Sequence, residues 1–526
     1  MKTKYTLILA FALFAVTTNV SSQQILNSFC IGSADNEFIH DAKSTSDGGM
    51  IAAGYIEAAP GTTSEASYGQ KDFWVVKTHA NGTIEWKNHF GGSLNDEAFS
   101  IAETSLGEFL VAGCSYSSDH DVSDHIGSTE SCDIWLLWIT ENGQLTQSKS
   151  YGSIGNEFAK SVAINSQNKI NLIAEVTTEA PTIDPILGEC DIWIAQMDFN
   201  GNIDWQNVYG GTKSDHPSDM LVTPNDDICV IGSSNSFTSS PSDYETYILK
   251  VNTNGETEWE QYIFSNSQIG IGTPGKMSYT NEGELLVSFI SAVQQDDLNC
   301  NAHGSFQYAI LDEDGEMIAQ HCFGGTGYDT AKAIIKDDDG NFWMIGTTDS
   351  NDGDVPAPIG YTDEASNIWI GVADESGQLL TSMNIGGSLT EEAISIFKKP
   401  NGQIIVAATT NSSNGDVTGA NDLTGNTTDA WLITLDATIS ALTDVSEKSI
   451  NIYPNPAKDV IRLEGNSFSG KEKITICDAT GKAIAHWQVP MTGQTFDTSG
   501  LTPGLYSMQI IGENGNLIST AKFIKE

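Results

Sequence analysis

Basic side chains are scarce in this sequence. Its 526 residues include 24 lysines and arginines against 69 aspartates and glutamates, a net charge of −45, and Arg462 is the only arginine. A surface of this sign repels nucleic acids and anionic membranes. With a single arginine, it also has almost none of the forked guanidinium groups that bind phosphate and carboxylate groups best. We therefore expect no nucleic-acid partner. The acidity indicates either solubility in a salty exterior or capture of divalent cations.

Long apolar runs are absent except near the N-terminus, where "MKTK" precedes "YTLILAFALFAV". That run is short for a bilayer span, which takes about 20 residues. A basic start, a short apolar run and the small residues of "NVSSQ" are typical of a secretory signal peptide. We predict a signal peptide at residues 1–22 and no transmembrane segment in the mature chain.

Cysteine is infrequent too, with eight residues, and no CxxC pair or cysteine–histidine spacing typical of zinc sites occurs. Disulfides can form in an exported protein. Cys114 and Cys132 flank one predicted loop, so a local bridge between them is one hypothesis. Cys30 and Cys322 stand at the same place in their repeats. The pairing itself does not follow from the sequence.

Enzyme signatures are missing as well. The sequence contains no HExxH, no GxSxG and no phosphate-binding GxxxxGK[ST]. Its nine histidines are scattered, and paired carboxylates are too common here to indicate glycoside hydrolysis. We assign no catalytic residue and no cofactor-binding residue. The sequence favours a binding protein over an enzyme.

A repeated glycine phrase is what the sequence does have. "FGGSLNDEAFS" at residues 90–100 returns as "FGGTGYDTAKA" at 323–333 and as "IGGSLTEEAIS" at 385–395. Aligned on this phrase, seven units begin near Ile31, Phe90, Tyr151, Tyr209, Phe264, Phe323 and Ile385. A nearly fixed period of this length indicates a repeat architecture.

Each unit shows four short apolar segments separated by turn residues. In the second unit they are "EAFSIAET", "EFLVAGCS", "DIWLLWIT" and "QLTQSKSY". Asn-Gly pairs between the third and fourth segments, as at Asn142-Gly143, are strong hairpin signals. We predict an all-β protein with a seven-bladed β-propeller over residues 23–445. A stacked solenoid is the alternative, but it needs capping ends.

Ring closure is predicted from the two ends of the repeat region. The seventh unit lacks a clear fourth strand, while the mature N-terminus "QQILNSFCIG" resembles the end of a unit. We expect residues 25–29 to complete the last blade.

One aromatic residue recurs in the third segment of the units. The set is Trp74, Trp135, Trp193, Tyr247, Trp369 and Trp431, with Tyr308 one place out of register. Such rings either pack between blades or form a platform for sugars. Their mid-strand position favours packing.

The glycine phrase is interpreted as the crossing from one blade to the next. Glycine permits the backbone angles of a sharp reversal, and an acid or asparagine that follows it can cap free backbone amides. The residues expected in this capping role are Asn36, Asp96, Asn156, Asp215, Asp329 and Glu391.

Long loops join the second and third segments and should lie on the same face as the crossings. Functional groups usually gather on such loops. Three of them, near residues 119, 352 and 414, share a D/N-x-D-V core. Closely spaced oxygen ligands suit Ca²⁺, so weak calcium candidates are Asp119, Asp121, Asp124, Asp352, Asp354 and Asp416. Solvated turns explain the same residues, and His120 with His125 could instead hold a transition metal.

The composition changes after about residue 445. Residues 447–526 hold eight basic and eight acidic residues, so the acid excess lies before them. Alternating apolar and polar residues predict a small Ig-like β-sandwich at residues 446–526. "YPNPA" at 453–457, "LTPGLY" at 501–506 and the terminal "KFIKE" resemble the type A C-terminal sorting domain of cargo of the type IX secretion system, found in Bacteroidetes-type bacteria. The residues that carry this resemblance are Tyr453, Pro454, Asn455, Pro456, Pro503, Gly504, Tyr506, Lys522 and Lys525.

The resemblance implies passage through the periplasm and then the outer membrane, directed by the tail through contact with the secretion machinery. The product would be secreted or held on the outer cell surface. Repeats of this kind are similar to the propeller-like repeats found in such cargo. We predict an extracellular binding or adhesion protein with a glycan or protein ligand. A propeller-based polysaccharide hydrolase or lyase is the alternative, because loops of different blades can jointly build a catalytic site.

Overall fold

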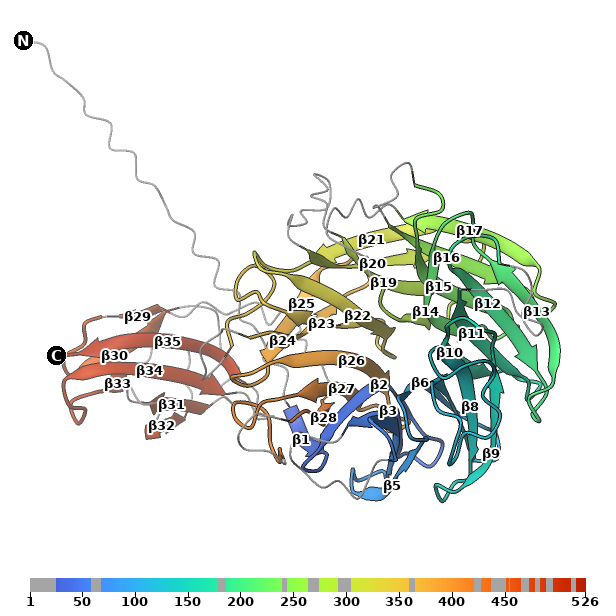
Figure 1. The fold of residues 1–526 in the computed structure, drawn as a ribbon. Coiled ribbons are helices and arrows are strands. Elements are labelled where there is room, and N and C mark those ends of the chain that lie inside the picture. The colour runs from blue at the N-terminus through green and yellow to red at the C-terminus, as the bar shows by residue number, and fades with distance from the viewer. Residues whose placement is uncertain are drawn as a thin grey trace, which may run out of the picture. The chain divides into compact units, whose positions relative to one another are not determined.

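The computed structural model describes residues 25–57, 68–177, 186–238, 244–263, 274–291, 304–358, 365–420, 427–436, 451–453, 455–464, 473–477, 483–488, 495–511 and 517–526. The chain divides into two compact units, residues 1–438 and 439–526 (Figure 1). Every regular element in the described ranges is a β-strand, so these ranges contain no membrane-spanning helix.

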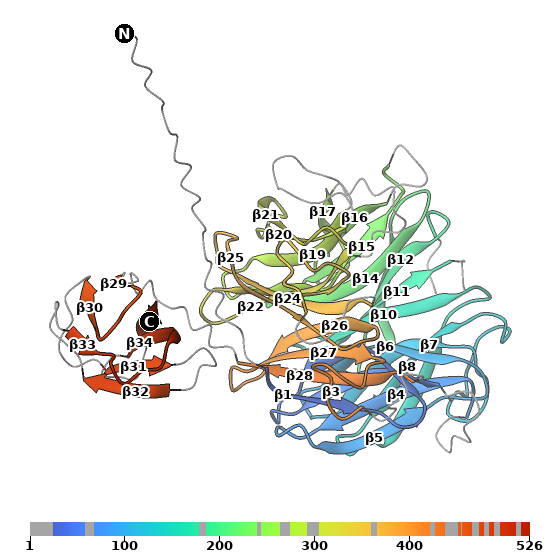
Figure 2. The ribbon, with the colours of Figure 1, turned by 90° about the vertical axis from the view of Figure 1, so that its left-hand side faces the viewer.

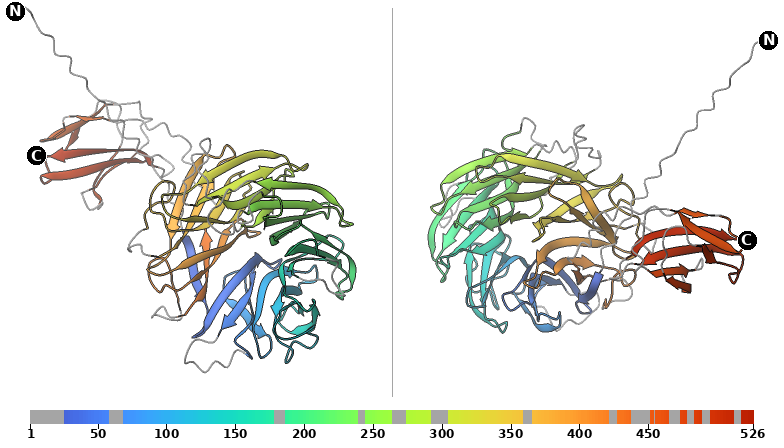
Figure 3. Two further views of the ribbon diagram at one scale, coloured as in Figure 1. Left: turned by 45° about the horizontal axis from the view of Figure 1, so that its top comes forward. Right: turned by 180° about the vertical axis from the view of Figure 1, so that it is seen from behind.

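Seven four-stranded antiparallel sheets form the first unit, and they are arranged as the blades of a propeller (Figures 2 and 3). The first blade contains β2 (Asn36–Ser44), β3 (Met50–Glu57), β4 (Lys71–Thr78) and β5 (Ile84–Phe90). The second contains β6 (Asp96–Glu103), β7 (Phe109–Ser115), β8 (Asp133–Ile139) and β9 (Leu145–Tyr151). The third contains β10 (Glu157–Ile164), β11 (Ile170–Val176), β12 (Asp191–Met197) and β13 (Ile203–Tyr209).

The remaining blades follow the same order. The fourth contains β14 (Asp215–Val222), β15 (Ile228–Ser234), β16 (Glu245–Val251) and β17 (Thr257–Ile263). The fifth contains β18 (Met277–Tyr279), β19 (Leu285–Ser291), β20 (Ser305–Leu311) and β21 (Met317–Phe323). The sixth contains β22 (Asp329–Lys336), β23 (Phe342–Thr348), β24 (Asn367–Ala373) and β25 (Leu379–Ile385). The seventh contains β26 (Glu391–Lys398), β27 (Ile404–Thr410), β28 (Asp429–Leu435) and β1 (Ile25–Ile31).

The predicted ring closure is confirmed. β1 pairs antiparallel with β28, so the N-terminal strand is the outer strand of the last blade (Figure 2). The Cys30 amide also donates to the Thr418 carbonyl at 3.2 Å. Residues from the two ends of the repeat region thus share one sheet.

The core lies in the junctions between blades. At the junction of the seventh and first blades, Ile405 and Leu432 pack in one cluster with Ile39 and Trp74. The middle strands are buried on both faces, as in the fully buried β8, because each blade packs against two neighbours. No blade can bury its apolar faces alone, so each blade depends on its two neighbours for stability.

The recurring aromatic ring is part of this core. Trp135, Trp193 and Trp431 are fully buried, and Tyr308 is buried despite its shifted register. Each full burial contributes about 2–3 kcal/mol. The rings therefore pack between blades and do not form an exposed sugar platform.

The tight turns on the opposite face also tie blades together. The indole nitrogen of Trp86 donates to the Glu141 carbonyl in the next blade at 2.8 Å. Gly143, in the same turn at φ 80°, lies against that indole, and a Cβ there would stand 2.7 Å from its ring. The Asn-Gly turn supplies both the backbone angle and the space.

The described residues of the second unit form two sheets. The three-stranded sheet contains β29 (Asn451–Tyr453), β30 (Val460–Glu464) and β33 (Thr495–Asp497). The four-stranded sheet contains β32 (Ala483–Gln488), β31 (Lys473–Cys477), β34 (Gly504–Ile511) and β35 (Leu517–Lys525).

The cysteines differ in part from expectation. Cys114 and Cys132 are free thiols, so the local bridge is not formed. Cys322 is disulfide-bonded, while Cys30 is free.

Candidate functional site

Within the described residues, six blade-to-blade crossings are held by a carboxylate at the start of the next blade. In the second blade, Asp96 accepts the Gly92 amide at 2.7 Å and the Ser117 hydroxyl at 2.9 Å. The amide of the second glycine of the phrase also donates to a carboxylate in three later blades. The acceptors are Asp215 at 2.7 Å in the fourth blade, Asp329 at 2.8 Å in the sixth and Glu391 at 2.9 Å in the seventh. The predicted capping role is confirmed for these residues.

Two of the predicted caps are displaced by one residue. The Asn156 side chain accepts the Cys132 amide at 3.0 Å, and its neighbour Glu157 accepts the Ser153 amide at 2.9 Å. Glu37, the neighbour of the predicted cap Asn36, likewise accepts a hydrogen bond from the Ser33 hydroxyl. Glu37 and Glu157 lie six residues after the start of their units, the position that Asp96 and Glu391 occupy in theirs. The prediction was therefore wrong by one residue in these two units.

In several crossings a second side-chain oxygen faces the cap across the first glycine of the phrase. A Cβ on Gly91 would lie 2.6 Å from the Asp72 Oδ1 and 2.7 Å from the Asp96 Oδ2. Three further crossings repeat this arrangement around Gly152, with Asp133 and Glu157, around Gly210, with Asp191 and Asp215, and around Gly386, with Asn367 and Glu391. Glycine recurs here because two buried side-chain oxygens flank its Cα.

Burial keeps several of these acids partly protonated near neutral pH. Burial, followed by the charge of Asp96, raises the pKa of Asp72 to about 7. Burial also raises the pKa of Glu37 to about 7 and that of Asp133 to about 6. The Oδ1 atoms of Asp72, Asp133 and Asp191 are buried without a hydrogen-bond partner. A proton there removes a charge that the site cannot solvate.

The D/N-x-D-V loops clamp the same crossings from outside. The Asp121 amide donates to the Gly91 carbonyl at 3.1 Å, and its carboxylate accepts the Gly91 amide at 3.2 Å. Asp119 accepts the Ser93 amide at 2.7 Å, and Val122 is fully buried beneath the loop. These contacts place the long loops and the crossings on one face, called here the crossing face.

The clamp recurs in the sixth and seventh blades. Asp354 accepts the Gly324 amide at 3.2 Å, and Asp352 accepts the Thr326 amide at 2.7 Å. In the seventh blade, Asp416 accepts the Gly386 amide at 3.2 Å. The motif therefore holds a loop against a crossing in three blades.

All six calcium candidates lie on this face and accept hydrogen bonds from the chain. Asp124 accepts the amide and the hydroxyl of Ser150, both at 3.0 Å. The two histidines have separate partners, because His120 stacks on Tyr68 with centroids 4.6 Å apart while the His125 Nδ1 lies 3.1 Å from the Asp133 carboxylate. Calcium binding here stays a prediction.

An ion pair connects blades on opposite sides of the ring. The Lys276 ammonium in the fifth blade lies 2.6 Å from the Asp41 carboxylate in the first. Burial opposes ionisation of Asp41, but Lys276 and then Lys43 hold its pKa far below its usual value. An ion pair therefore links the innermost strand of the first blade, β2, to the residue that directly precedes β18 in the fifth.

The candidate sorting residues converge on the end of the chain. The Asn455 side chain accepts the Ile524 amide at 2.9 Å, and the Ala457 amide donates to the Ile524 carbonyl at 2.7 Å. The Glu526 amide donates to the Ala457 carbonyl at 2.9 Å. "YPNPA" and "KFIKE", far apart in sequence, therefore form one bonded structure.

The third motif joins them. Tyr506 stacks on Phe523 with centroids 5.6 Å apart, and its hydroxyl donates to the Thr502 carbonyl at 2.7 Å. Gly504 is in register with Lys525, whose side chain is buried and donates to the Glu526 carbonyl at 2.6 Å.

Three of the sorting residues lie wholly or partly outside this description. Pro454 is outside the described residues, as are the side chains of Tyr453 and Lys522. The exposed side chains of Asn455, Pro456 and Pro503 belong to the described part.

Fold and site together define an all-β protein with a seven-bladed propeller and a separate C-terminal β unit whose end is tied to its start. Residues 451–526 match the family model of the secretion system C-terminal sorting domain, that of the type IX system. This domain indicates export to the cell surface or secretion. No curated protein sequence matches the chain.

Solved structures resemble the chain at low identity. PorZ, a bacterial surface component of the type IX secretion system of Porphyromonas gingivalis, is 12% identical with a TM-score of 0.42, and the match covers 94% of this chain. The chain spans 60% of the length of that protein. A Dyadobacter fermentans protein of unknown function is 10% identical with a TM-score of 0.40, over 79% of this chain and 100% of that one.

Proposed function

We propose that this chain is a cell-surface or secreted binding protein delivered by its C-terminal tail. The signal peptide at 1–22 directs entry into the periplasm, the propeller at 23–445 is the cargo, and residues 446–526 engage the type IX machinery. The family match at 451–526 carries this proposal. The convergence of the three motifs on the last residues supplies a recognisable terminal structure.

The tail is proposed to be an Ig-like β-sandwich. Its two sheets share one apolar cluster, in which Ile461 and Phe496 of the three-stranded sheet meet Ile474, Met508 and Phe523 of the four-stranded sheet. Face-to-face packing of two antiparallel sheets is the arrangement of a sandwich.

The crossing face is proposed to bind an extracellular glycan or protein. Its long loops are fixed to the crossings by carboxylate–amide bonds, as between Asp119 and Ser93. Loops fixed on a rigid scaffold hold their side chains ready for a ligand at low entropic cost. The acid-rich composition favours ligands that are neutral or basic.

A reporter fusion tests export. Residues 446–526, placed behind a signal peptide and a periplasmic reporter, should carry the reporter outside cells that possess type IX secretion. The reporter without these residues is the control and should stay in the periplasm. Equal retention of both would refute the role of the tail.

A glycan and protein array together with a turnover screen tests binding. The mature chain should capture a ligand without changing it. Formation of shortened polysaccharide products would instead support the hydrolase or lyase alternative.

Calcium binding has its own test. Calorimetric titration of the chelated mature chain with Ca²⁺ should release or absorb heat and raise the melting temperature. Absence of both effects would remove the calcium hypothesis, and the export proposal would stand unchanged.

A further inference from the structure

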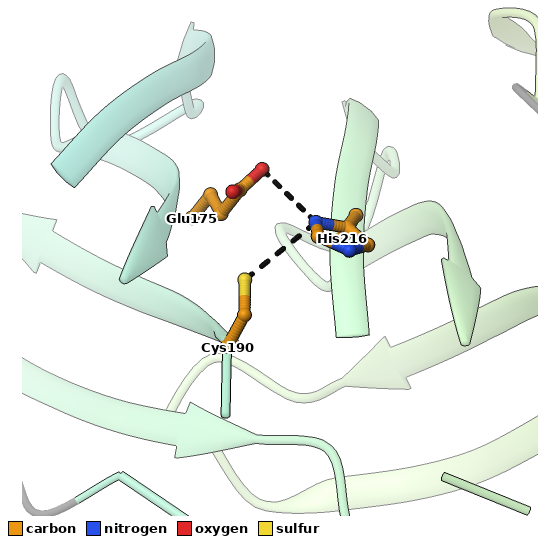
Figure 4. A group of neighbouring side chains, drawn as sticks. All are labelled: Glu175, Cys190 and His216. Atoms are coloured by element: carbon orange, nitrogen blue, oxygen red, sulfur yellow. Dashed lines mark hydrogen bonds and ion pairs between the residues drawn. The ribbon is translucent and has the colours of Figure 1, made fainter. Parts of the chain in front are cut away.

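Three metal-ligand side chains of different kinds meet at the junction of the third and fourth blades (Figure 4). Glu175 is in β11, Cys190 immediately precedes β12, and His216 is in β14. The His216 Nδ1 lies 3.2 Å from the Glu175 Oε2 and 3.6 Å from the Cys190 Sγ. All three ligand atoms lie within 4.8 Å of one another.

Hydrogen bonding gives only part of this arrangement a role. A neutral imidazole nitrogen carries either one hydrogen or one lone pair. If the His216 Nδ1–H donates to Glu175, that nitrogen has no lone pair for the Cys190 thiol, whose Sγ lies beside it. The thiol then keeps a long contact to the Asp215 carbonyl, at 3.8 Å. A cation placed among the three atoms would be bonded to all of them.

The spacing fits a tetrahedral zinc site. Ligand atoms placed tetrahedrally at about 2.3 Å for sulfur and about 2.0 Å for nitrogen lie about 3.5 Å apart, and a nitrogen and an oxygen lie about 3.3 Å apart. The observed separations are 3.6 and 3.2 Å. We propose that Glu175, Cys190 and His216 bind one Zn²⁺ ion, with the fourth position taken by water.

The exposure of the three side chains is consistent with a zinc ion that has three protein ligands and a fourth coordination position open to water. The Glu175 and His216 side chains are 16% and 27% exposed, whereas Cys190 is 5% exposed. The thiol would be the inner ligand and water would enter from the side of the other two. Zinc sites that keep an exchangeable water use three protein ligands.

The charges balance when zinc is bound. Binding breaks the Cys190 S–H bond, the sulfur lone pair bonds the ion, and the proton leaves to solvent. The Cys190 thiolate and the Glu175 carboxylate together carry two negative charges, which balance the two positive charges of the ion. Lys160 lies 3.8 Å from the Glu175 Oε2 and orients the carboxylate.

The fold does not require these ligands at this place. Equivalent positions in the preceding junctions hold Tyr55, Lys71 and Glu97 in the first, and Cys114, Cys132 and Phe158 in the second. In the first junction Lys71 pairs with Glu97 at 2.7 Å. One junction has an ion pair, the next has two thiols, and the third has a mixed ligand set.

The test is metal titration of the full mature chain, reduced and freed of metal. Cobalt(II), the spectroscopic substitute for zinc, should bind one equivalent and give a thiolate-to-cobalt charge-transfer band that one equivalent of Zn²⁺ abolishes. Cys190→Ser should remove the band. His216→Gln, at a partly exposed position, should lower the affinity for zinc at least ~10-fold.

Cys132→Ser is the matched control, because Cys132 occupies the position of Cys190 in the preceding junction. It should leave both the band and the stoichiometry unchanged. A wild-type chain without the charge-transfer band would overturn the proposal. So would a band lost in Cys132→Ser and kept in Cys190→Ser. His216→Gln decides the matter should Cys190→Ser fail to fold.

Discussion

The propeller and the C-terminal unit both secure a chain end with a terminal strand, but they use different chemistry. In the propeller, β1 completes the last blade, and a capping carboxylate holds six crossings within the described ranges. In the C-terminal unit, "KFIKE" is bonded to Asn455 and Ala457 and packs on Tyr506. The first arrangement closes the ring of blades, whereas the second joins the motifs of the sorting domain to one another.

Removing β1 should have the largest effect on the propeller. Deletion of residues 23–30 exposes the edge of β28 and the junction that closes the ring. We expect the melting temperature of the propeller to fall by more than about 5 °C in calorimetry. Deletion of residues 23–24 alone is the control, and an unchanged melting temperature in the longer deletion would contradict ring closure.

Gly91→Ala tests the space between the paired carboxylates. The new Cβ would stand 2.6 Å from the Asp72 Oδ1, and such overpacking costs about 1–3 kcal/mol. Denaturant unfolding measures this loss. Gly107→Ala is the comparison, because that Cβ meets nothing within 4 Å although φ is +79°. A loss at Gly91 smaller than at Gly107 would refute the crowding.

The free energy of unfolding should depend on pH differently in the propeller and in the C-terminal unit. Since burial raises the pKa of Asp72 and Glu37 to about 7, the folded chain holds protons that the unfolded chain releases between pH ~4 and ~7. The free energy of unfolding of the propeller should therefore fall as the pH rises through this window.

Asp72→Asn sharpens the same comparison. The sixth blade already has Asn367 at this position, beside Gly386 and Glu391. The neutral amide avoids burying a charge, so this variant should be more stable than wild type at pH 8 and less sensitive to pH. Melting curves between pH 5 and 8 measure it, and a steeper pH dependence in the variant would count against partial protonation.

Asp352→Ala should have the smallest effect. It removes the bonds to the Thr326 amide at 2.7 Å and the Thr326 hydroxyl at 2.9 Å, at a cost of about 1 kcal/mol. Asp339→Ala, an exposed acid in a turn of the opposite face, should change stability by less than about 0.5 kcal/mol. Equal effects would show that the loop clamp adds nothing.

The sequence predicted the ring because its signals are local and repeated. The glycine phrase recurs in six of the seven units, the Asn-Gly turn in the first four, and an aromatic residue in the third segment of every unit. This periodicity located the blades. The pairing of β1 with β28 also followed, because one end lacked a strand and the other supplied it.

The carboxylate pairs and the mixed ligand cluster were not predicted. Asp72 and Asp96 belong to neighbouring blades and meet only through the fold, although an acid two residues before Trp74, Trp135 and Trp193 was a visible signal. Glu175, Cys190 and His216 come from three strands with no zinc-like spacing. Contacts of this kind depend on strand register between units, which composition does not encode.

Cell fractionation of two chains tests the central claim most directly. The full chain and a chain ending at residue 521 differ only in "KFIKE", which bonds Asn455 and Ala457 in the tail. In cells with type IX secretion, the full chain should reach the exterior, while the shortened chain should accumulate in the periplasm with its propeller melting temperature unchanged. Arrival of both chains outside in equal amounts would contradict the account.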